Sequence, residues 1–418
     1  MSKFIINGER QLSGELNILG AKNSVLPLLA AAILTDEKVV LHNCPDISDV
    51  HNMLAILQSL GSVTTFDKGD ITIDSSNINN EVVPSKLAHE LRSSIFLLGS
   101  ILSKFNKATL SYPGGCEIGE RPIDIHLKGL KELGVNITEE SGQIYCKNSK
   151  KISTTEIVLD IPSVGATENL MMASVFADGI VTLRNVAREP EIVDLQNFLN
   201  SMGAKIYGAG CGVIVVHGVK KLYGVEYTPI GDRIVAGTYM IGAAMCGGDI
   251  TLKGINCEYL SALVSKLSKT TCNIYANNDI IRIKSKGRHP RLGKIDTMYY
   301  PGFPTDLQSQ MSALGAVADG ISIITENIFE TRFKQIPEFR KMGAIVDIKG
   351  RTAIFEGVPK LYGAEVKAED LRGGASLVLM GLFASGTTVV HDIKHIDRGY
   401  QSMELDIQSL GGDIVRVN

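Results

Sequence analysis

Six stretches of the chain are apolar on nearly every face over the length of a short helix, and small residues predominate in them. Each stretch opens with polar or charged residues, and a β-branched segment typical of a strand usually follows it. A helix that is apolar all round is buried on every side, whereas a surface helix carries one apolar stripe. The pattern therefore predicts buried helices over 20–34, 91–103, 165–179, 231–245, 304–320 and 371–386.

A second helical pattern follows each buried helix and ends at a Leu-Gly or Met-Gly pair, or in one degraded copy at Leu-Ser. A short strand is predicted between the two helices, and a hairpin with a glycine or polar turn after the second. The pattern thus repeats helix–strand–helix–strand–strand six times, with a period of about 70 residues. The pairs begin at Leu60, Leu133, Met202, Leu267, Met342 and Leu410.

The two chain ends complement each other in this scheme. The sixth copy stops at Asn418 before its second hairpin strand, and Lys3–Ile18 is predicted to be a leftover strand pair. We infer that this pair completes copy six, so that both ends meet in one domain. At 418 residues the chain exceeds the ~250–300 residues of a single core. Two domains of three copies are expected, 22–229 and 1–21 with 230–418; one solenoid of six units is the alternative.

Composition narrows the class of protein. The net charge of -3 gives no electrostatic case for binding nucleic acid or an acidic membrane. No run reaches the ~18 apolar residues of a membrane span, and the N-terminus has no signal core. Seven cysteines without a Cys-x-x-Cys pair favour free thiols and a cytoplasmic location. No ligand spacing for a metal and no nucleotide-cleaving or dinucleotide motif is present. We expect a monomer.

The loop over 112–126 carries the most specific chemistry. It places Cys116 among glycines and runs into a predicted helix that carries Arg121. Glycines let the backbone approach a ligand closely, and a guanidinium and a helix N-terminus both favour the reactive thiolate. The alternative is a buried structural cysteine beside a tight turn. The glycine-rich context favours the reactive thiol.

Cationic and polar residues stand at or beside the starts of several buried helices. Helix N-termini attract anions, and arginine grips carboxylate or phosphate with two hydrogen bonds. Together with a reactive cysteine, such residues indicate a small, doubly charged anion as substrate. Asp306 stands at one of these helix starts, where a simple N-cap is the alternative to a functional role. The candidate cations are Lys22, Arg92, Arg121, Arg332, Arg372 and Arg398.

Motifs along essentially the whole chain resemble the UDP-N-acetylglucosamine enolpyruvyl transferases. The resemblance implies a two-domain inside-out α/β barrel with six repeats of a βαβαββ-type unit, three per domain. It implies transfer of the enolpyruvyl group of phosphoenolpyruvate to the 3-hydroxyl of UDP-N-acetylglucosamine with release of phosphate, the first committed step of peptidoglycan synthesis. No cofactor and no metal are implied. The motifs are Lys22-Asn23, Arg92 and the segments 113–126, 163–169, 231–238, 301–310, 326–333, 370–377 and 395–400.

The resemblance also implies residue roles. Cys116 matches the proton donor, which also forms a covalent adduct with the enolpyruvyl group, and Asp306 matches the base. Lys22 and Arg398 are implied in catalysis as well. Phosphoenolpyruvate contacts are implied for Lys22, Asn23, Arg121, Arg332, Arg372 and Arg398. UDP-sugar contacts are implied for Asn23, Arg92, Arg121, Pro122, Ile123, Asp124, Ile125, Ser163, Val164, Gly165, Asp306 and Ile328.

One position departs from the family pattern. Many members have a basic residue two positions before Ser163, where this chain has Ile161, so no basic contact to the diphosphate is carried over to it. Two alternatives for the function stay open. One is the same transfer to shikimate 3-phosphate, against which the Cys116 loop argues. The other is a catalytically silent regulator that binds a UDP-sugar, against which the presence of both Cys116 and Asp306 argues.

Overall fold

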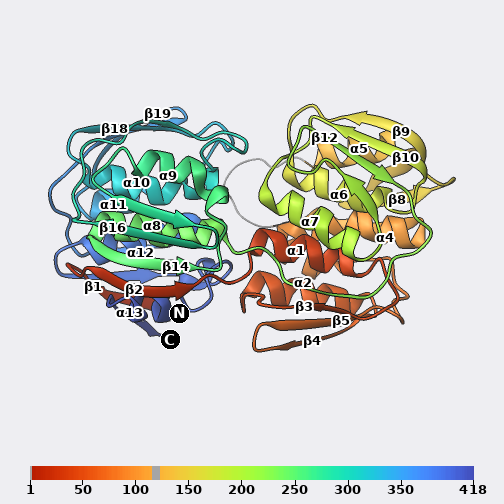
Figure 1. Ribbon diagram of the computed structural model, residues 1–418, viewed down its shortest axis with the longest axis horizontal. Coiled ribbons are helices and arrows are strands. Elements are labelled where there is room, and N and C mark those ends of the chain that lie inside the picture. Colours follow the sequence, from red (N-terminus) through yellow and green to blue (C-terminus); the bar gives the residue numbers. More distant parts are fainter. Residues whose placement is uncertain (1, 115–122) are drawn as a thin grey trace. The chain divides into compact units, whose positions relative to one another are not determined.

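The computed structural model describes residues 2–114 and 123–418. The described chain divides into two compact units, one made by 2–19 with 231–418 and the other by 20–114 with 123–230 (Figure 1). Each unit has its own hydrophobic core. Cys116, Arg121 and Pro122 lie outside the described residues.

The unit of residues 20–230 contains the first three repeats. The first has α1 (Lys22–Ala32), β3 (Val39–Leu41), α2 (Ser48–Ser59), β4 (Val63–Asp67) and β5 (Asp70–Asp74). The second has α3 (Ser85–Glu90), the 3₁₀ helix η1 (Arg92–Phe96), α4 (Leu97–Phe105), β6 (Lys107–Ser111), α5 (Asp124–Glu132), β7 (Val135–Glu140) and β8 (Gln143–Asn148). The third has β9 (Ser153–Val158), α6 (Val164–Ser174), β10 (Asp178–Arg184), α7 (Pro190–Ser201), β11 (Lys205–Tyr207) and β12 (Val213–His217), and β13 (Val225–Tyr227) follows it.

The other unit contains the last three repeats and both chain ends. The fourth repeat has α8 (Arg233–Cys246), β14 (Gly248–Lys253), η2 (Cys257–Leu260), α9 (Ser261–Leu267), β15 (Asn273–Asn277) and β16 (Ile280–Ser285). The fifth has β17 (Gly293–Asp296), η3 (Thr305–Leu307), α10 (Gln308–Val317), β18 (Ile321–Thr325), α11 (Ile336–Lys341), β19 (Ile345–Lys349) and β20 (Thr352–Glu356). The sixth has β21 (Glu365–Lys367), α12 (Leu371–Phe383), β22 (Thr387–His391), η4 (Ile393–His395), α13 (Met403–Ser409) and β23 (Asp413–Val417); β1 (Lys3–Asn7) and β2 (Leu12–Asn17) open the chain.

The predicted buried helices are confirmed. Every residue of α10 is buried, and α12 is buried from Leu371 to Leu382. In this unit α8, α10 and α12 pack against one another, and the sheets lie outside them (Figure 1). Strands such as β16 alternate exposed and buried residues, as a sheet with one face on the core requires. Helices in the middle and sheets outside are the inside-out arrangement of each unit.

The prediction for the N-terminal strand pair is right for one strand and wrong for the other. β1 does complete copy six, because it lies between β22 and β23 with antiparallel pairing to both. β2 instead pairs in parallel with β14 of copy four. The reason is a missing neighbour: β13, which precedes α8 in the chain, pairs with β3 of copy one. β2 takes the edge that β13 leaves open, and this closure of each unit excludes an open six-repeat solenoid.

Candidate active site

The centre of the candidate site in the unit of 2–19 and 231–418 is the carboxylate of Asp306. Arg332 donates from Nη2 to Oδ1 of Asp306 over 2.7 Å, and Arg372 donates from Nη2 to Oδ2 over 3.2 Å. The two arginine side chains are 2% and 5% exposed, and that of Asp306 is 25% exposed. A partly exposed carboxylate thus pairs with two buried cations, each of which stabilises its ionised form.

The capping alternative for Asp306 is wrong. Neither η3 nor α10, which begin on either side of this residue, receives a side-chain cap hydrogen bond at its N-terminus. Both carboxylate oxygens are engaged by guanidinium groups instead. The neighbouring Thr305 donates to the buried Glu326 over 2.9 Å and so anchors the first turn from the other side.

Two of the hydrogen-bond donor atoms of Arg332 are not used by the described part of the chain. Its Nε and Nη1 atoms are buried and find no hydrogen-bond partner among the described residues. Leaving such donors unsatisfied is costly, and a bound anion would satisfy them. Its guanidinium also lies over the ring of Phe329, 5.3 Å from the centroid. These observations point to an anion-binding position beside Asp306.

The neighbours of Arg372 keep its guanidinium charged and fix its backbone. Burial would lower the pKa of its guanidinium, but Asp306, Tyr400 and Asp232 together raise it above the ordinary value. The residue sits in the first turn of α12, whose N-cap is Asp370. The Asp370 carboxylate accepts hydrogen bonds from the backbone N–H groups of Arg372 and Gly373 over 2.9 Å each. The cap fixes the backbone from which the guanidinium extends.

Two further predicted residues belong to this unit. Ile328 lies in the turn after β18, and its N–H donates to Glu326 over 2.8 Å. Arg398 was expected at the start of the last helix; it is half-buried and lies in the turns between η4 and α13, because that helix begins only at Met403. The positive charges of Lys394 and Arg398 add to burial in lowering the pKa of His395.

In the unit of residues 20–230, Lys22 begins α1 and is buried. Its ammonium group contacts Asp49 of α2 over 2.6 Å. Asn23 follows at the second position of α1. The next residue, Ser24, donates to Asp194 of α7, whose carboxylate also accepts from the hydroxyl of Tyr227 over 2.6 Å. A buried polar network therefore anchors the end of α1 that carries the predicted contacts.

α5, α6 and η1 meet around His126, the third residue of α5. Its Nδ1 accepts from the amide of Asn169 over 3.0 Å, and that amide also donates to Ile95 of η1 over 3.1 Å. Burial, with a smaller contribution from the charge of Arg92, lowers the pKa of His126 to about 3, so its ring is neutral. A Cβ at Gly165 would lie 3.1 Å from this ring, so glycine lets α6 approach it.

The other predicted UDP-sugar residues follow these helix starts. Ser163 is the N-cap of α6 and accepts from Ala166 over 3.3 Å; Val164 is the first residue of that helix. Ile123 precedes α5 and is buried, Asp124 begins α5, and Ile125 is half-buried. Arg92 begins η1, and burial lowers the pKa of its guanidinium. Together with α1, which carries Asn23, four helix N-termini with predicted UDP-sugar contacts belong to this unit.

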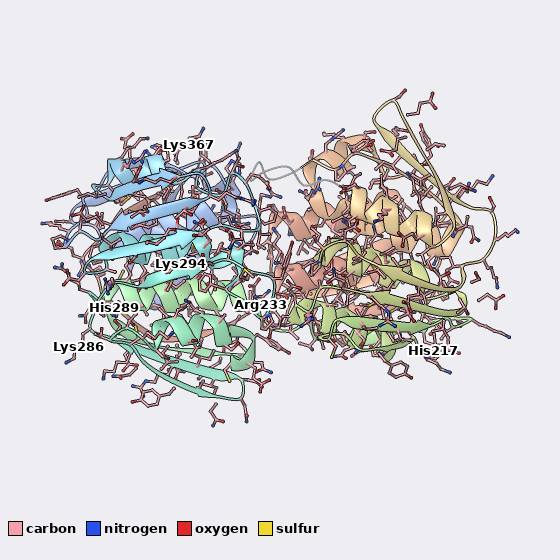
Figure 2. All side chains as sticks on the ribbon, turned by 90° about the horizontal axis from the view of Figure 1, so that it is seen from above. His217, Arg233, Lys286, His289, Lys294 and Lys367 are labelled. Carbon is pink, nitrogen blue, oxygen red and sulfur yellow. The ribbon has the colours of Figure 1, made fainter. Side chains whose placement is uncertain are left out.

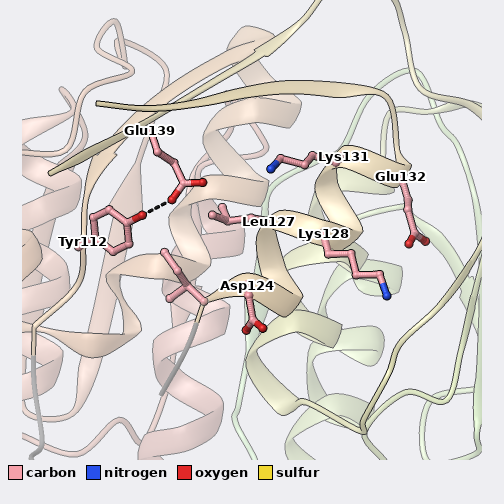
Figure 3. A pocket seen from close by; sticks show the side chains of 8 residues that line it. Tyr112, Asp124, Leu127, Lys128, Lys131, Glu132 and Glu139 are labelled. Carbon is pink, nitrogen blue, oxygen red and sulfur yellow. Dashed lines mark hydrogen bonds between the residues drawn. The ribbon is translucent and has the colours of Figure 1, made fainter. Parts of the chain in front are cut away.

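A cavity of about 700 Å³ adjoins α5 (Figure 3). Tyr112 donates its hydroxyl to Glu139 on the wall of the cavity. The lining includes two of the predicted UDP-sugar residues, Ile123 and Asp124, together with charges of both signs. The full lining is Tyr112, Ile123, Asp124, Leu127, Lys128, Lys131, Glu132 and Glu139. Ile161 is 45% exposed, and beside it in sequence Asp160 accepts from Lys128 over 2.7 Å.

Cys272 and His289 lie together in the unit of 231–418; His289 is labelled in Figure 2. Cys272 Sγ is 3.7 Å from its Nε2. That nitrogen donates to the carbonyl of Ala244 over 2.8 Å, while Nδ1 accepts from the hydroxyl of Thr271 over 2.6 Å. Because Nε2 carries the proton, it cannot take one from the thiol, and burial raises the pKa of Cys272. This pair is structural, not a nucleophile with its base.

Sequence reasoning missed several residues that support the site. Glu326 accepts hydrogen bonds from the hydroxyl of Thr305 and from the backbone N–H of Ile328. Its position could have indicated this role, because it follows a predicted strand directly and is the first residue of the 326–333 motif. Asp49 and Asp194 carry no local signal, because their partners lie far away in the sequence. No helix in the described part of the chain has the length and hydropathy for a membrane crossing.

Comparisons with known proteins bear on the family of the chain and on its fold. Residues 6–406 match the family model described as EPSP synthase (3-phosphoshikimate 1-carboxyvinyltransferase). The chain is 52% identical to UDP-N-acetylglucosamine 1-carboxyvinyltransferase 2 of Caldanaerobacter subterraneus subsp. tengcongensis, with 100% of each chain covered. It is 48% identical to UDP-N-acetylglucosamine 1-carboxyvinyltransferase 1 of Carboxydothermus hydrogenoformans, with 100% of this chain and 99% of the relative covered.

Two solved structures share the fold. The enolpyruvyl transferase NikO from Streptomyces tendae superposes with a TM-score of 0.89 at 24% identity, covering 100% of this chain and 99% of the other. EPSP synthase from Acinetobacter baumannii superposes with a TM-score of 0.74 at 18% identity, covering 100% of both chains. At these identities the likeness concerns the fold alone, and it confirms the predicted two-domain α/β architecture.

Proposed function

The chain belongs to the EPSP synthase family and, within it, to the UDP-N-acetylglucosamine 1-carboxyvinyltransferases, and from this premise we propose that it transfers the enolpyruvyl group of phosphoenolpyruvate to the 3-hydroxyl of UDP-N-acetylglucosamine. Phosphate is the second product. Relatives with that name are 46–52% identical over the full chain. The reaction is a step of peptidoglycan synthesis, and both substrates are small molecules.

The observation that carries the proposal is the Asp306 carboxylate between the buried guanidinium groups of Arg332 and Arg372. Phosphoenolpyruvate brings a phosphate and a carboxylate, and the unused donors of Arg332 suit such an anion. Lys22, Asn23, Arg121 and Arg398 complete the proposed contacts to this substrate. Donors fixed in advance stabilise charge that develops in the reaction without reorganising.

The proposed reaction is an addition followed by an elimination. A proton is added to the methylene carbon of phosphoenolpyruvate, and the sugar 3-hydroxyl adds to the adjacent carbon as it loses its own proton. The product of this step is a tetrahedral ketal. Loss of a proton from the methyl group and of phosphate then restores the double bond. An acid for carbon and a base for the hydroxyl are required, and we assign them to Cys116 and Asp306.

The helix starts in the unit of residues 20–230 support binding of the UDP-sugar. N-terminal N–H groups and helix dipoles favour anions such as a diphosphate. We propose contacts from Arg92, Arg121 with Pro122, the segment 123–125 and the segment 163–165, with Asn23, Asp306 and Ile328 near the sugar. We further propose a cytoplasmic monomer whose two compact units act as domains, with boundaries close to residues 21 and 230.

A phosphate-release assay tests the proposal. Purified protein with phosphoenolpyruvate is expected to release phosphate when UDP-N-acetylglucosamine is added, and mass spectrometry should find the enolpyruvyl ether of that nucleotide sugar. Phosphate release with shikimate 3-phosphate instead would favour the related transfer of the family. Binding of the UDP-sugar by calorimetry without turnover would indicate a silent regulator. Either result would overturn the proposed activity.

A further inference from the structure

No step of the proposed reaction involves Tyr400, the last residue of the 395–400 motif, although its hydroxyl contacts Arg372 of the candidate site. The side chain is 2% exposed, and its ring lies beneath the guanidinium of Arg372, 5.6 Å from the carbon atom that joins the three nitrogens. A buried tyrosine hydroxyl needs partners, and the identity of these partners decides what it does.

The direction of each hydrogen bond follows from counting protons. Thr238 of α8 donates its hydroxyl proton to the carbonyl of Ile234 over 2.8 Å, so its oxygen can only accept from Tyr400, 2.8 Å away. The Tyr400 hydroxyl therefore donates its hydrogen bond to the hydroxyl oxygen of Thr238. Its oxygen is left to accept from Nη1 of Arg372 over 3.3 Å and from the amide of Gln310 over 3.3 Å.

Arg372 is thereby held between two acceptors. Nη1 reaches the hydroxyl of Tyr400, and Nη2 reaches Oδ2 of Asp306 over 3.2 Å. The three buried helices of the unit contribute to this connection, because Thr238, Gln310 and Arg372 lie on α8, α10 and α12. The tyrosine hydroxyl thus ties the packing of the helix core to the orientation of the Asp306 carboxylate.

We propose that Tyr400 is a positioning residue for the transfer reaction: its hydroxyl fixes the guanidinium of Arg372 and, through it, the carboxylate of Asp306. The inference rests on the proposed function, in which Arg372 binds phosphoenolpyruvate and Asp306 is the base. Removing the hydroxyl leaves a buried guanidinium donor without its acceptor, and the guanidinium then shifts to recover a partner.

The test compares Tyr400→Phe with Tyr239→Phe. Tyr239 is a matched control, because it is 1% exposed, lies in the same unit and donates its hydroxyl to Asp406 over 2.7 Å. Both changes remove one buried hydroxyl, so both should lower Tm. Tyr400→Phe is expected to lower kcat/KM for phosphoenolpyruvate by on the order of tenfold or more, as for loss of a hydrogen bond to a charged group. Tyr239→Phe should leave it within about twofold of wild type.

A double-mutant cycle tests whether Tyr400 acts through Arg372. In an Arg372→Lys background the guanidinium fork is gone, so adding Tyr400→Phe should cost little more in kcat/KM, whereas Tyr239→Phe stays additive. Thr238→Val, which removes the acceptor of the Tyr400 proton but keeps the tyrosine, should lower the same parameter by a smaller factor. It serves as the second variant if Tyr400→Phe fails to fold.

The outcomes separate the two proposals. If the wild-type protein does not transfer the enolpyruvyl group, the proposed function fails. If wild type turns over and Tyr400→Phe retains the kcat/KM of Tyr239→Phe, the role of Tyr400 is overturned while the function stands. An undiminished cost of Tyr400→Phe in the Arg372→Lys background likewise contradicts action through Arg372.

Discussion

At the scale of single residues, the candidate site is organised by the ion pairs of one carboxylate, that of Asp306, with two arginines. Asp306 accepts from Arg332 and Arg372 on separate oxygens, so each oxygen is fixed by one cation. Local sequence left a capping role open for Asp306, and the structure shows ion pairs instead. The competing cap is lost because the two arginines, which come from distant segments, offer stronger charge-assisted hydrogen bonds.

Replacing Asp306 by Asn tests its assigned role as the base. The amide keeps the shape but cannot accept a proton from the sugar hydroxyl, so kcat is expected to fall by roughly 10²–10⁴. Steady-state kinetics with both substrates measures the change. Asp319→Asn is the control, because Asp319 pairs with Arg288 over 3.0 Å at the exposed end of a strand connection. Retention of kcat in Asp306→Asn would remove this residue from the mechanism.

The second residue-scale prediction concerns Cys116. Cys116→Asp is expected to retain transfer, since a carboxylic acid can also supply a proton, whereas Cys116→Ala should lose roughly 10²–10⁴ in kcat. The Asp variant should also resist fosfomycin, an epoxide that alkylates thiols. Time-dependent inhibition followed by mass spectrometry provides the measurement. An Asp variant that turns over and is still fully inhibited would show that the thiol assignment is incorrect.

At the scale of elements, α6 contains a buried carboxyl group that has no hydrogen-bond partner in the described part of the chain. Glu168 is 0% exposed, and neither carboxylate oxygen has a hydrogen-bond partner among the described residues. Burial, together with Glu191 and Glu189, raises its pKa well above the ordinary value. The folded protein therefore favours the protonated acid, and this preference makes folding less favourable as pH rises from the ordinary carboxyl range toward the raised pKa.

Glu168→Gln is accordingly expected to stabilise the protein at pH 8. The amide has nearly the same shape and no charge to lose, so the free energy of unfolding should rise by roughly 1–3 kcal/mol, with a smaller gain at pH 5. Denaturant unfolding at both pH values provides the measurement, and Glu90→Gln at the exposed end of α3 is the control. An equal effect at pH 5 and pH 8 would contradict the assigned pKa shift.

At the scale of the whole molecule, the chain passes from one unit to the other after residue 19 and returns after residue 230. The strand before each passage, β2 or β13, pairs within the unit that the chain is leaving. All strands of the sheets in the unit of 20–230 lie within that segment. The other unit needs β1 at the centre of one sheet and β2 at the edge of another. In β1, Phe4 and Ile6 are 0% exposed, so this strand supplies core as well as pairing.

These pairings predict different behaviour for two fragments. Residues 20–230 should fold alone with cooperative unfolding, because none of its described strands lacks a partner within the fragment. Residues 231–418 should not fold until a peptide of residues 1–19 is added, because a central strand and its buried side chains are missing. Circular dichroism and denaturant titration measure both. Cooperative folding of 231–418 alone would contradict the structural role of β1.

Much of the architecture could be predicted from the sequence, because helix and strand periods are local properties. The buried helices, the helix ends at residues such as Leu60 and Met202, and the hairpins all follow from spacing within about a dozen residues. Motifs along the whole chain, including Asp306 and the 395–400 segment, pointed to the family. Those features depend only on neighbours in the chain, which the sequence displays directly.

Tertiary structure alone decided which distant segments became partners. The pairing of β2 with β14 and of β13 with β3 joins strands that are far apart in the chain, and several patterns of pairing satisfy the same local signals. The contact of Asp306 with Arg332 joins residues 26 apart in the chain. The contacts of Asp306 with Arg372 and of Tyr400 with Thr238 join side chains from separate repeats. Such contacts arise from packing in three dimensions, for which no short-range pattern exists.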